Sequence, residues 1–220
     1  MKISRCIGAF CALSSSLSCA GAHADAPRAT APATSGAFPF RNGDRVVFLG
    51  DSITEQRLYT TYLETYLLTR FPSWNLKFRN AGWGGDTSFL RTRGVPATQA
   101  LQRDVLDLHP TIVTIDFSMN DAGYGAFKQD LYDQHVAGEA AIVRQLRAAN
   151  VRPVVLTASA VEKNEPGHNM QGYNQTLEQF AFGDAAVASR DGVPFADQFH
   201  PFVEAINRLR SVGGGLRLAA

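Results

Sequence analysis

Short apolar segments that alternate with amphipathic ones constrain the fold of this chain more than any other feature. Strand-like apolar runs occupy residues 46–49, 76–78, 111–117, 153–157 and 193–196. Between and after them, apolar residues recur at helical spacing in 59–67, 101–108, 136–146, 173–181 and 202–209. Because continuous apolar strands separated by helices are typical of parallel sheets, we predict an α/β domain. Its mainly parallel sheet would have about five strands and helices on both faces.

The first residues of the chain have the pattern of an export signal. Lys2 and Arg5 precede an apolar stretch, and Ala22-His23-Ala24 fits the small-x-small cleavage pattern. We therefore predict a signal peptide at 1–24, cleaved after Ala24, and a protein that is periplasmic or secreted. Residues 25–37 are rich in Ala, Pro, Thr and Ser, which predicts a flexible leader. The domain itself would span residues 38–220.

Cysteine content and charge exclude several classes of function. The three cysteines, Cys6, Cys11 and Cys19, all lie in the predicted signal peptide, so the exported domain would have no disulfide and no cysteine metal site. The formal net charge of +1 and the absence of a Lys/Arg cluster argue against nucleic-acid partners. No later apolar run has the length of a membrane span, and no grouping predicts a metal site. The sequence sets no oligomeric state.

Three polar clusters come directly after three predicted strands. They are Gly50-Asp51-Ser52, the glycine-rich segment "NAGWGGDT" at 80–87, and "SMND" at 118–121. Taken singly, each fits a helix cap or a turn. In a parallel sheet, however, the carboxyl ends of the strands meet at one edge, where ligands bind. Together the clusters offer a hydroxyl, backbone donors and an amide donor, which is the set that acyl transfer needs.

The order "GDSIT", "NAGWGGDT" and "SMND" resembles blocks one, two and three of the SGNH/GDSL hydrolases. The resemblance implies a flavodoxin-like three-layer α/β/α fold and hydrolysis of esters without a metal or cofactor. It implies Ser52 as the nucleophile, with its own backbone N–H as one oxyanion donor. Gly85 would supply a second backbone donor and Asn120 an amide donor. Ser118 stands where the family usually has glycine.

A serine nucleophile needs a base, which in the resembled family comes from a late Asp-x-x-His. The chain offers Asp197 and His200 at this spacing, and two interpretations remain open. In the first, His200 takes the serine proton and Asp197 orients the ring. In the second, Asp197 caps the helix that follows, His200 is incidental, and the chain is truncated and lacks the true pair. We regard His109, His135 and His168 as poorer bases.

The leading interpretation is an exported serine esterase that acts on small acyl esters, with acetylated carbohydrate as one candidate substrate. The alternative is a catalytically inactive or truncated binding protein of the same fold. A nucleotide or flavin binder is disfavoured, because "GDSIT" lacks the run of Ser, Thr and Gly that would hold a phosphate.

Overall fold

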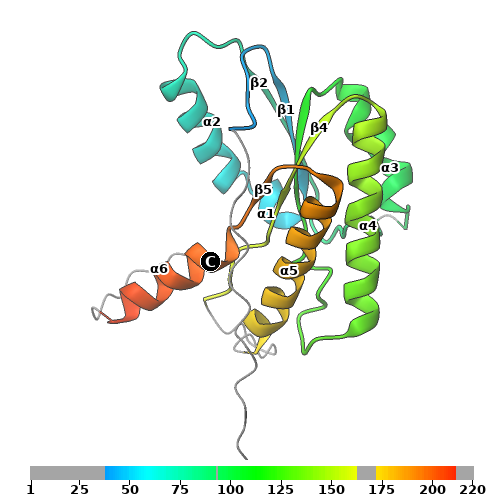
Figure 1. Ribbon diagram of the computed structural model, residues 1–220, viewed down its shortest axis with the longest axis vertical. Coiled ribbons are helices and arrows are strands. Elements are labelled where there is room, and N and C mark those ends of the chain that lie inside the picture. Colours follow the sequence, from blue (N-terminus) through cyan, green and yellow to red (C-terminus); the bar gives the residue numbers. More distant parts are fainter. Residues whose placement is uncertain (1–37, 93, 163–171, 212–220) are drawn as a thin grey trace, which may run out of the picture. The chain divides into compact units, whose positions relative to one another are not determined.

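A five-stranded parallel sheet forms the centre of the computed structural model, which describes residues 38–92, 94–162 and 172–211 (Figure 1). The strands are β1 (Arg45–Gly50), β2 (Lys77–Gly82), β3 (Ile112–Asp116), β4 (Arg152–Leu156) and β5 (Phe195–Ala196). Their order is β2-β1-β3-β4-β5, and all four pairings are parallel. The predicted α/β fold is therefore confirmed. The predicted signal peptide, the leader and His168 lie outside the described residues.

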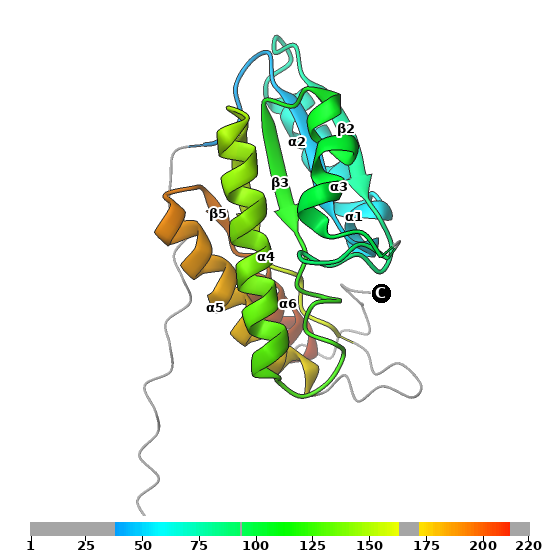
Figure 2. The ribbon, with the colours of Figure 1, turned by 90° about the vertical axis from the view of Figure 1, so that its right-hand side faces the viewer.

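Helices cover both faces of this sheet. They are α1 (Ser52–Glu55), α2 (Leu58–Arg70), α3 (Ala97–Asp104), α4 (Gln129–Ala148), α5 (Tyr173–Asp191) and α6 (Phe199–Ser211). One apolar cluster joins α3, α4 and α5 to one face of the sheet, and a second joins α2 to the opposite face (Figure 2). A third cluster packs α6 against α5. No helix in the described ranges has both the length and the apolar character of a membrane span.

The register of the strands brings the predicted polar clusters to one level. Gly50, the last residue of β1, lies opposite Gly82 of β2 and opposite Asp116 of β3. The segments that begin at Asp51, Trp83 and Phe117 therefore leave the same edge of the sheet side by side. This is the edge at which parallel α/β sheets bind their ligands.

Two elements differ from their predicted bounds. The strand predicted at 76–78 continues to Gly82, so Asn80 belongs to β2 rather than to the loop. The strand tolerates this amide because Asn80 donates to the Thr54 carbonyl oxygen (2.6 Å) and accepts from the Gly82 N–H (2.9 Å). The helix predicted at 101–108 breaks at Val105, whose φ of −130° is not helical, and continues as a 3₁₀ turn, Leu106–Leu108.

Candidate active site

Ser52 is the first residue of α1, two residues beyond the end of β1. The turn between them needs glycine, because a Cβ on Gly50 would lie 2.4 Å from the carbonyl oxygen of Asp116. Asp51 caps α1, since its Oδ1 accepts from the Ile53 N–H (2.9 Å). The Ser52 side chain is half-buried, and its Oγ makes no hydrogen bond to the residues that the structure describes. The Ser52 hydroxyl is thus positioned by β1 and α1 and remains available to a ligand.

The glycine-rich loop runs directly beside Ser52. A Cβ built on Gly84 would lie 3.9 Å from the Ser52 Cβ and 2.9 Å from Glu55 Oε2, so a side chain here would crowd both residues. The Gly84 N–H donates to Glu55 Oε2 (2.8 Å), which fixes the loop to α1. Gly85 has a φ of +78°, a conformation that favours glycine, and it is exposed. Its N–H has no acceptor among the described residues and can serve a ligand.

The amide of Asn120 joins the third cluster to the second. Its Nδ2 donates to the carbonyl oxygen of Asp86 at 2.9 Å, next to Gly85. The Tyr124 hydroxyl donates to Asn120 Oδ1 at 2.7 Å, which fixes the orientation of the amide. Because an amide nitrogen carries two hydrogens, Asn120 keeps one for a second acceptor. The structure therefore brings the segments of Ser52, Gly85 and Asn120 together at the sheet edge.

Asp86 shapes the loop that carries Gly85. Its Oδ1 accepts from the N–H and hydroxyl of Thr92 (2.8 and 3.0 Å), and its Oδ2 pairs with Arg91 (2.9 Å). Asp86 and Arg91 are both 1% exposed, so the charges compensate each other away from water. The loop is consequently held from within by charge-assisted bonds.

Asp197 and His200 form the pair that their spacing predicts, at the start of α6. Asp197 Oδ2 lies 2.7 Å from His200 Nδ1, and Asp197 Oδ1 accepts from the His200 N–H (3.1 Å). The other ring nitrogen, Nε2, lies 3.5 Å from Glu178 Oε1 on α5, and the ring packs against Phe182. The ring makes no hydrogen bond to Ser52 within the described residues. The contact between Asp197 and the ring fits the interpretation in which Asp197 orients His200 as a base. The contact between Asp197 and the His200 N–H fits the interpretation in which Asp197 caps α6.

The carboxyl group of Asp51 has an unusual proton affinity. It is 1% exposed, and its Oδ2 has no hydrogen-bond partner among the described residues. Burial, followed by the charges of Asp121 and Asp86, raises the pKa of Asp51 to about 7, although the bond from Ile53 lowers it. Between the two pKa values, the Asp51 carboxyl group is therefore protonated in the folded protein and ionised in the unfolded chain.

Replacing the Asp51 carboxyl group tests whether its pKa is raised in the folded protein. Between about pH 4 and pH 7 the folded state binds more protons than the unfolded state, so stability falls as the pH rises. Asp51→Asn keeps the acceptor for Ile53 but removes the titration. We expect it to be more stable than the native protein at pH 8, by at most about 4 kcal/mol, and similar at pH 4. Urea unfolding at both pH values measures this.

Asp133→Asn on the exposed face of α4 is the matched control and should show no such pH-dependent difference. An Asp51→Asn protein whose advantage is equal at the two pH values would contradict the raised pKa.

An open pocket of about 400 Å³ adjoins the loop. Its lining includes Glu55 and Arg57, which follow Ser52 on the chain, and Trp83 and Asp86 from the glycine-rich segment. The Trp83 side chain is 47% exposed, which leaves aromatic surface for a ligand. Carboxylate, guanidinium and indole groups in one hollow suit a polar molecule with an apolar ring face.

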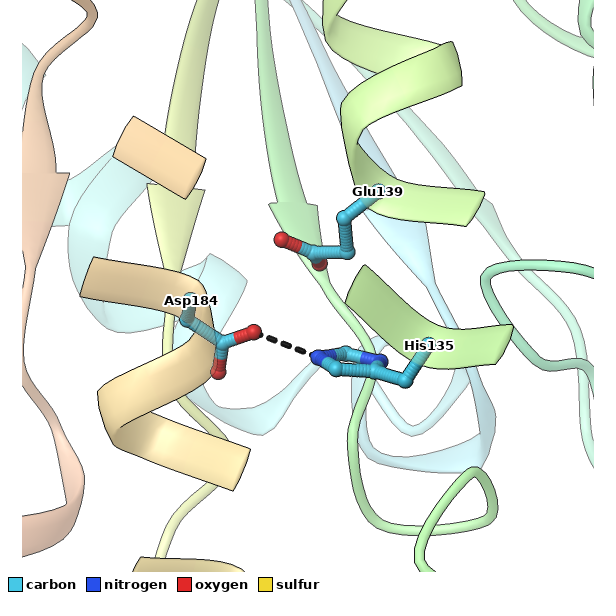
Figure 3. Close-up of side chains that lie close together, drawn as sticks. All are labelled: His135, Glu139 and Asp184. Atoms are coloured by element: carbon cyan, nitrogen blue, oxygen red, sulfur yellow. Dashed lines mark hydrogen bonds and ion pairs between the residues drawn. The ribbon is translucent and has the colours of Figure 1, made fainter. Parts of the chain in front are cut away.

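One buried group of residues was missed by the sequence analysis. His135 and Glu139 on α4 and Asp184 on α5 offer ligand atoms within 4.8 Å of one another, all of them buried (Figure 3). His135 Nε2 and Asp184 Oδ1 are, however, only 2.6 Å apart. Two ligands bound to one Zn²⁺ at about 2.0–2.1 Å in tetrahedral geometry lie about 3.3 Å apart. The His135–Asp184 contact therefore fits a shared proton better than a shared metal ion.

Comparison with solved structures finds the same fold in several enzymes. BT4096, described as a gut microbial diltiazem-metabolizing enzyme, is 26% identical with a TM-score of 0.68, over 84% of this chain and 43% of that chain. Axe2, an acetylxylan esterase from Geobacillus stearothermophilus, is 21% identical with a TM-score of 0.61, over 76% and 81%. A GDSL-like lipase from Bacteroides thetaiotaomicron is 21% identical with a TM-score of 0.54, over 72% and 70%. These likenesses at 21% identity support the fold alone.

Curated proteins give no match. Residues 48–216, which include all three polar clusters, match the GDSL-like Lipase/Acylhydrolase family. The chain therefore belongs to this family of ester hydrolases.

Proposed function

We propose that the protein is an exported serine esterase that cleaves small acyl esters through an acyl-enzyme on Ser52. The observation that carries the proposal is the meeting of three segments at one edge. Gly84 lies against Ser52, and Asn120 is bonded to the carbonyl oxygen beside Gly85. An ester carbonyl bound next to Ser52 would have donors from Gly85 and Asn120 within reach.

The proposed reaction has two steps. Ser52 Oγ attacks the ester carbonyl carbon while a base takes the hydroxyl proton, and the oxyanion that forms accepts hydrogen bonds from the Ser52 N–H, the Gly85 N–H and the Asn120 amide. The intermediate then breaks its C–O bond, and the alcohol leaves with the proton. Water attacks the acyl-enzyme in the same manner and releases the acid and free Ser52.

His200, oriented by Asp197, is our candidate for the base. The carboxylate on Nδ1 leaves Nε2 as the proton acceptor, as this chemistry requires. For this role Nε2 has to exchange its neighbour Glu178 for Ser52. The rival function is a binding protein with the same cleft, in which Asp197 and His200 only begin α6 and no base activates Ser52.

The substrate we propose is an ester of a polar alcohol, with acetylated carbohydrate as the first candidate. The pocket that adjoins the glycine-rich loop supports this, because Trp83 offers a stacking face and Glu55 and Arg57 offer hydrogen-bonding groups. The N-terminal residues 1–24 support export, since an exported esterase would meet such substrates outside the cytoplasm.

A fluorophosphonate probe separates the esterase from the binding protein. If a base activates Ser52, the probe should label the native protein rapidly, and the adduct should map to the peptide that contains Ser52. Heat-unfolded protein is the control and should not react. An unlabelled native protein would support the binding function. His200→Ala tests the base separately, because labelling that survives this change would remove His200 from the mechanism and leave the esterase in place.

A further inference from the structure

The ring of His135 lies between two carboxylates in the interior. It is 0% exposed on α4, with Nδ1 2.7 Å from Asp121 Oδ2 and Nε2 2.6 Å from Asp184 Oδ1. Figure 3 shows the Asp184 carboxylate of α5 directed at the ring, and Glu139 above it one turn further along α4. The ring therefore connects the segment after β3 to α5.

Each of the two carboxylates also holds a loop of the candidate active site. Asp121, which follows Asn120 on the chain, accepts from the Ser88 hydroxyl (2.5 Å) and the Ser88 N–H (3.1 Å). Asp184 accepts from the Ser118 hydroxyl at 3.0 Å. Ser88 lies three residues after Gly85, and Ser118 lies two before Asn120. The buried His135 ring is thus linked, through Asp121 and Asp184, to the segments that carry Gly85 and Asn120.

Close packing leaves little freedom in this arrangement. A Cβ on Gly138 would lie 2.7 Å from the Ser88 carbonyl oxygen, so α4 touches the backbone of the loop directly. Ser118 has a φ of +74°, a conformation that costs a residue other than glycine about 1–3 kcal/mol. Its bond to Asp184 offsets part of that cost. This explains how serine can stand where the family usually has glycine.

The protonation of the cluster agrees with this bracing. Burial lowers the pKa of His135, but the charges and hydrogen bonds of Asp184 and Asp121 outweigh it and raise the pKa well above its usual value. Both ring nitrogens then donate, as two carboxylate acceptors require. Burial and the charge of Asp184 raise the pKa of Glu139 well above its usual value, so it stays neutral. The positive charge of His135 is therefore balanced by Asp121 and Asp184 and not by Glu139.

We propose that His135 is a positioning residue, which sets the separation between the Gly85 N–H and the Asn120 amide through Asp121, Ser88, Asp184 and Ser118. The proposal rests on the esterase function above, in which these donors bind the oxyanion. Such donors act only at about 2.7–3.1 Å from the developing charge, and a displacement of about 1 Å can cost 10²-fold in rate.

His135→Gln tests this, because glutamine cannot donate at both ring positions. We expect kcat for an acetyl ester to fall about 10-fold or more while KM changes less than about two-fold. Ser88→Ala, which removes the hydroxyl that contacts Asp121 and His135 but leaves the ring in place, should lower kcat in the same way. Phe180→Leu is the matched control, since Phe180 packs against the ring at 5.0 Å and makes no hydrogen bond to it. It should lower stability and leave kcat unchanged.

A double-mutant cycle gives the decisive readout. Because His135 is proposed to act partly through Asn120, His135→Gln should lower kcat by a smaller factor in an Asn120→Ala background than in the native background. Equal losses in both backgrounds, or a Phe180→Leu loss as large as that of His135→Gln, would overturn the proposal. So would full kcat in both His135→Gln and Ser88→Ala. An active Ser52→Ala protein would instead overturn the esterase mechanism, so the two failures are distinct.

Discussion

Ser52→Ala should reduce ester hydrolysis by about 10⁴-fold or more, although the remaining oxyanion donors should keep the rate above that of the uncatalysed reaction. The reason is that no acyl-enzyme can form without Oγ, and enzymes with a serine nucleophile lose rates of this order when it is removed. Steady-state hydrolysis of p-nitrophenyl acetate, followed with purified protein, measures the effect. The probe that labels native protein should also leave the variant unlabelled.

The variant should keep its fold. Ser52 is half-buried, and its Oγ makes no hydrogen bond to the described residues, so its removal breaks no contact on which stability depends. We expect the free energy of unfolding to change by less than about 0.5 kcal/mol. Ser73→Ala, at an exposed turn, is the matched control and should keep full activity. Hydrolysis by Ser52→Ala at the native rate would refute the nucleophile.

Asn120→Ala should lower kcat about 10²- to 10³-fold, the second largest effect that we expect. The amide is directed by Tyr124 and by the Asp86 carbonyl, so its remaining hydrogen can meet the oxyanion with little reorganisation. Removing one such donor typically costs this much, and the loss falls on kcat because the bond strengthens in the transition state. Comparing kcat and KM between native and variant protein measures this.

Asn75→Ala provides the control for a lost carboxamide, because Asn75 is exposed and lies away from the carboxyl edge of the sheet. Its kinetic constants should equal those of the native protein. If Asn120→Ala raised KM and left kcat intact, Asn120 would bind substrate without stabilising the oxyanion, and that part of the mechanism would be wrong.

The parallel sheet could be predicted because its strands are short, apolar and regularly separated. The same regularity puts Ser52, Gly85 and Asn120 at strand ends, which made them visible as candidates. The end of β2 could not be seen, since Asn80 and Gly82 resemble loop residues and are stabilised by a contact with Thr54, which is remote in sequence. Contacts of this kind depend on tertiary packing that no local pattern contains.

The bracing by His135 was missed for a different reason. His135 and Glu139 lie on the same stripe of α4 as Ala140, Val143 and Leu146, all of which are buried. Charged residues on an apolar stripe were the available signal, because such groups are rarely buried without partners. Their partner Asp184, 49 residues beyond His135, could not be identified from the sequence. The spacing of Asp197 and His200 did predict their pairing, although the direction of Nε2 depends on how α6 packs on α5.

The loop after β2 has one side at the open pocket and the other in the protein interior. Trp83 faces the open pocket, whereas Ser88 is anchored in the interior through Asp121. Laboratory evolution of substrate range should therefore begin at Trp83, which lines the pocket and is exposed. Libraries that include Ser88 or Gly138 should yield mostly inactive clones. We therefore expect substrate range to change most readily on the pocket side of this loop and least on its buried side.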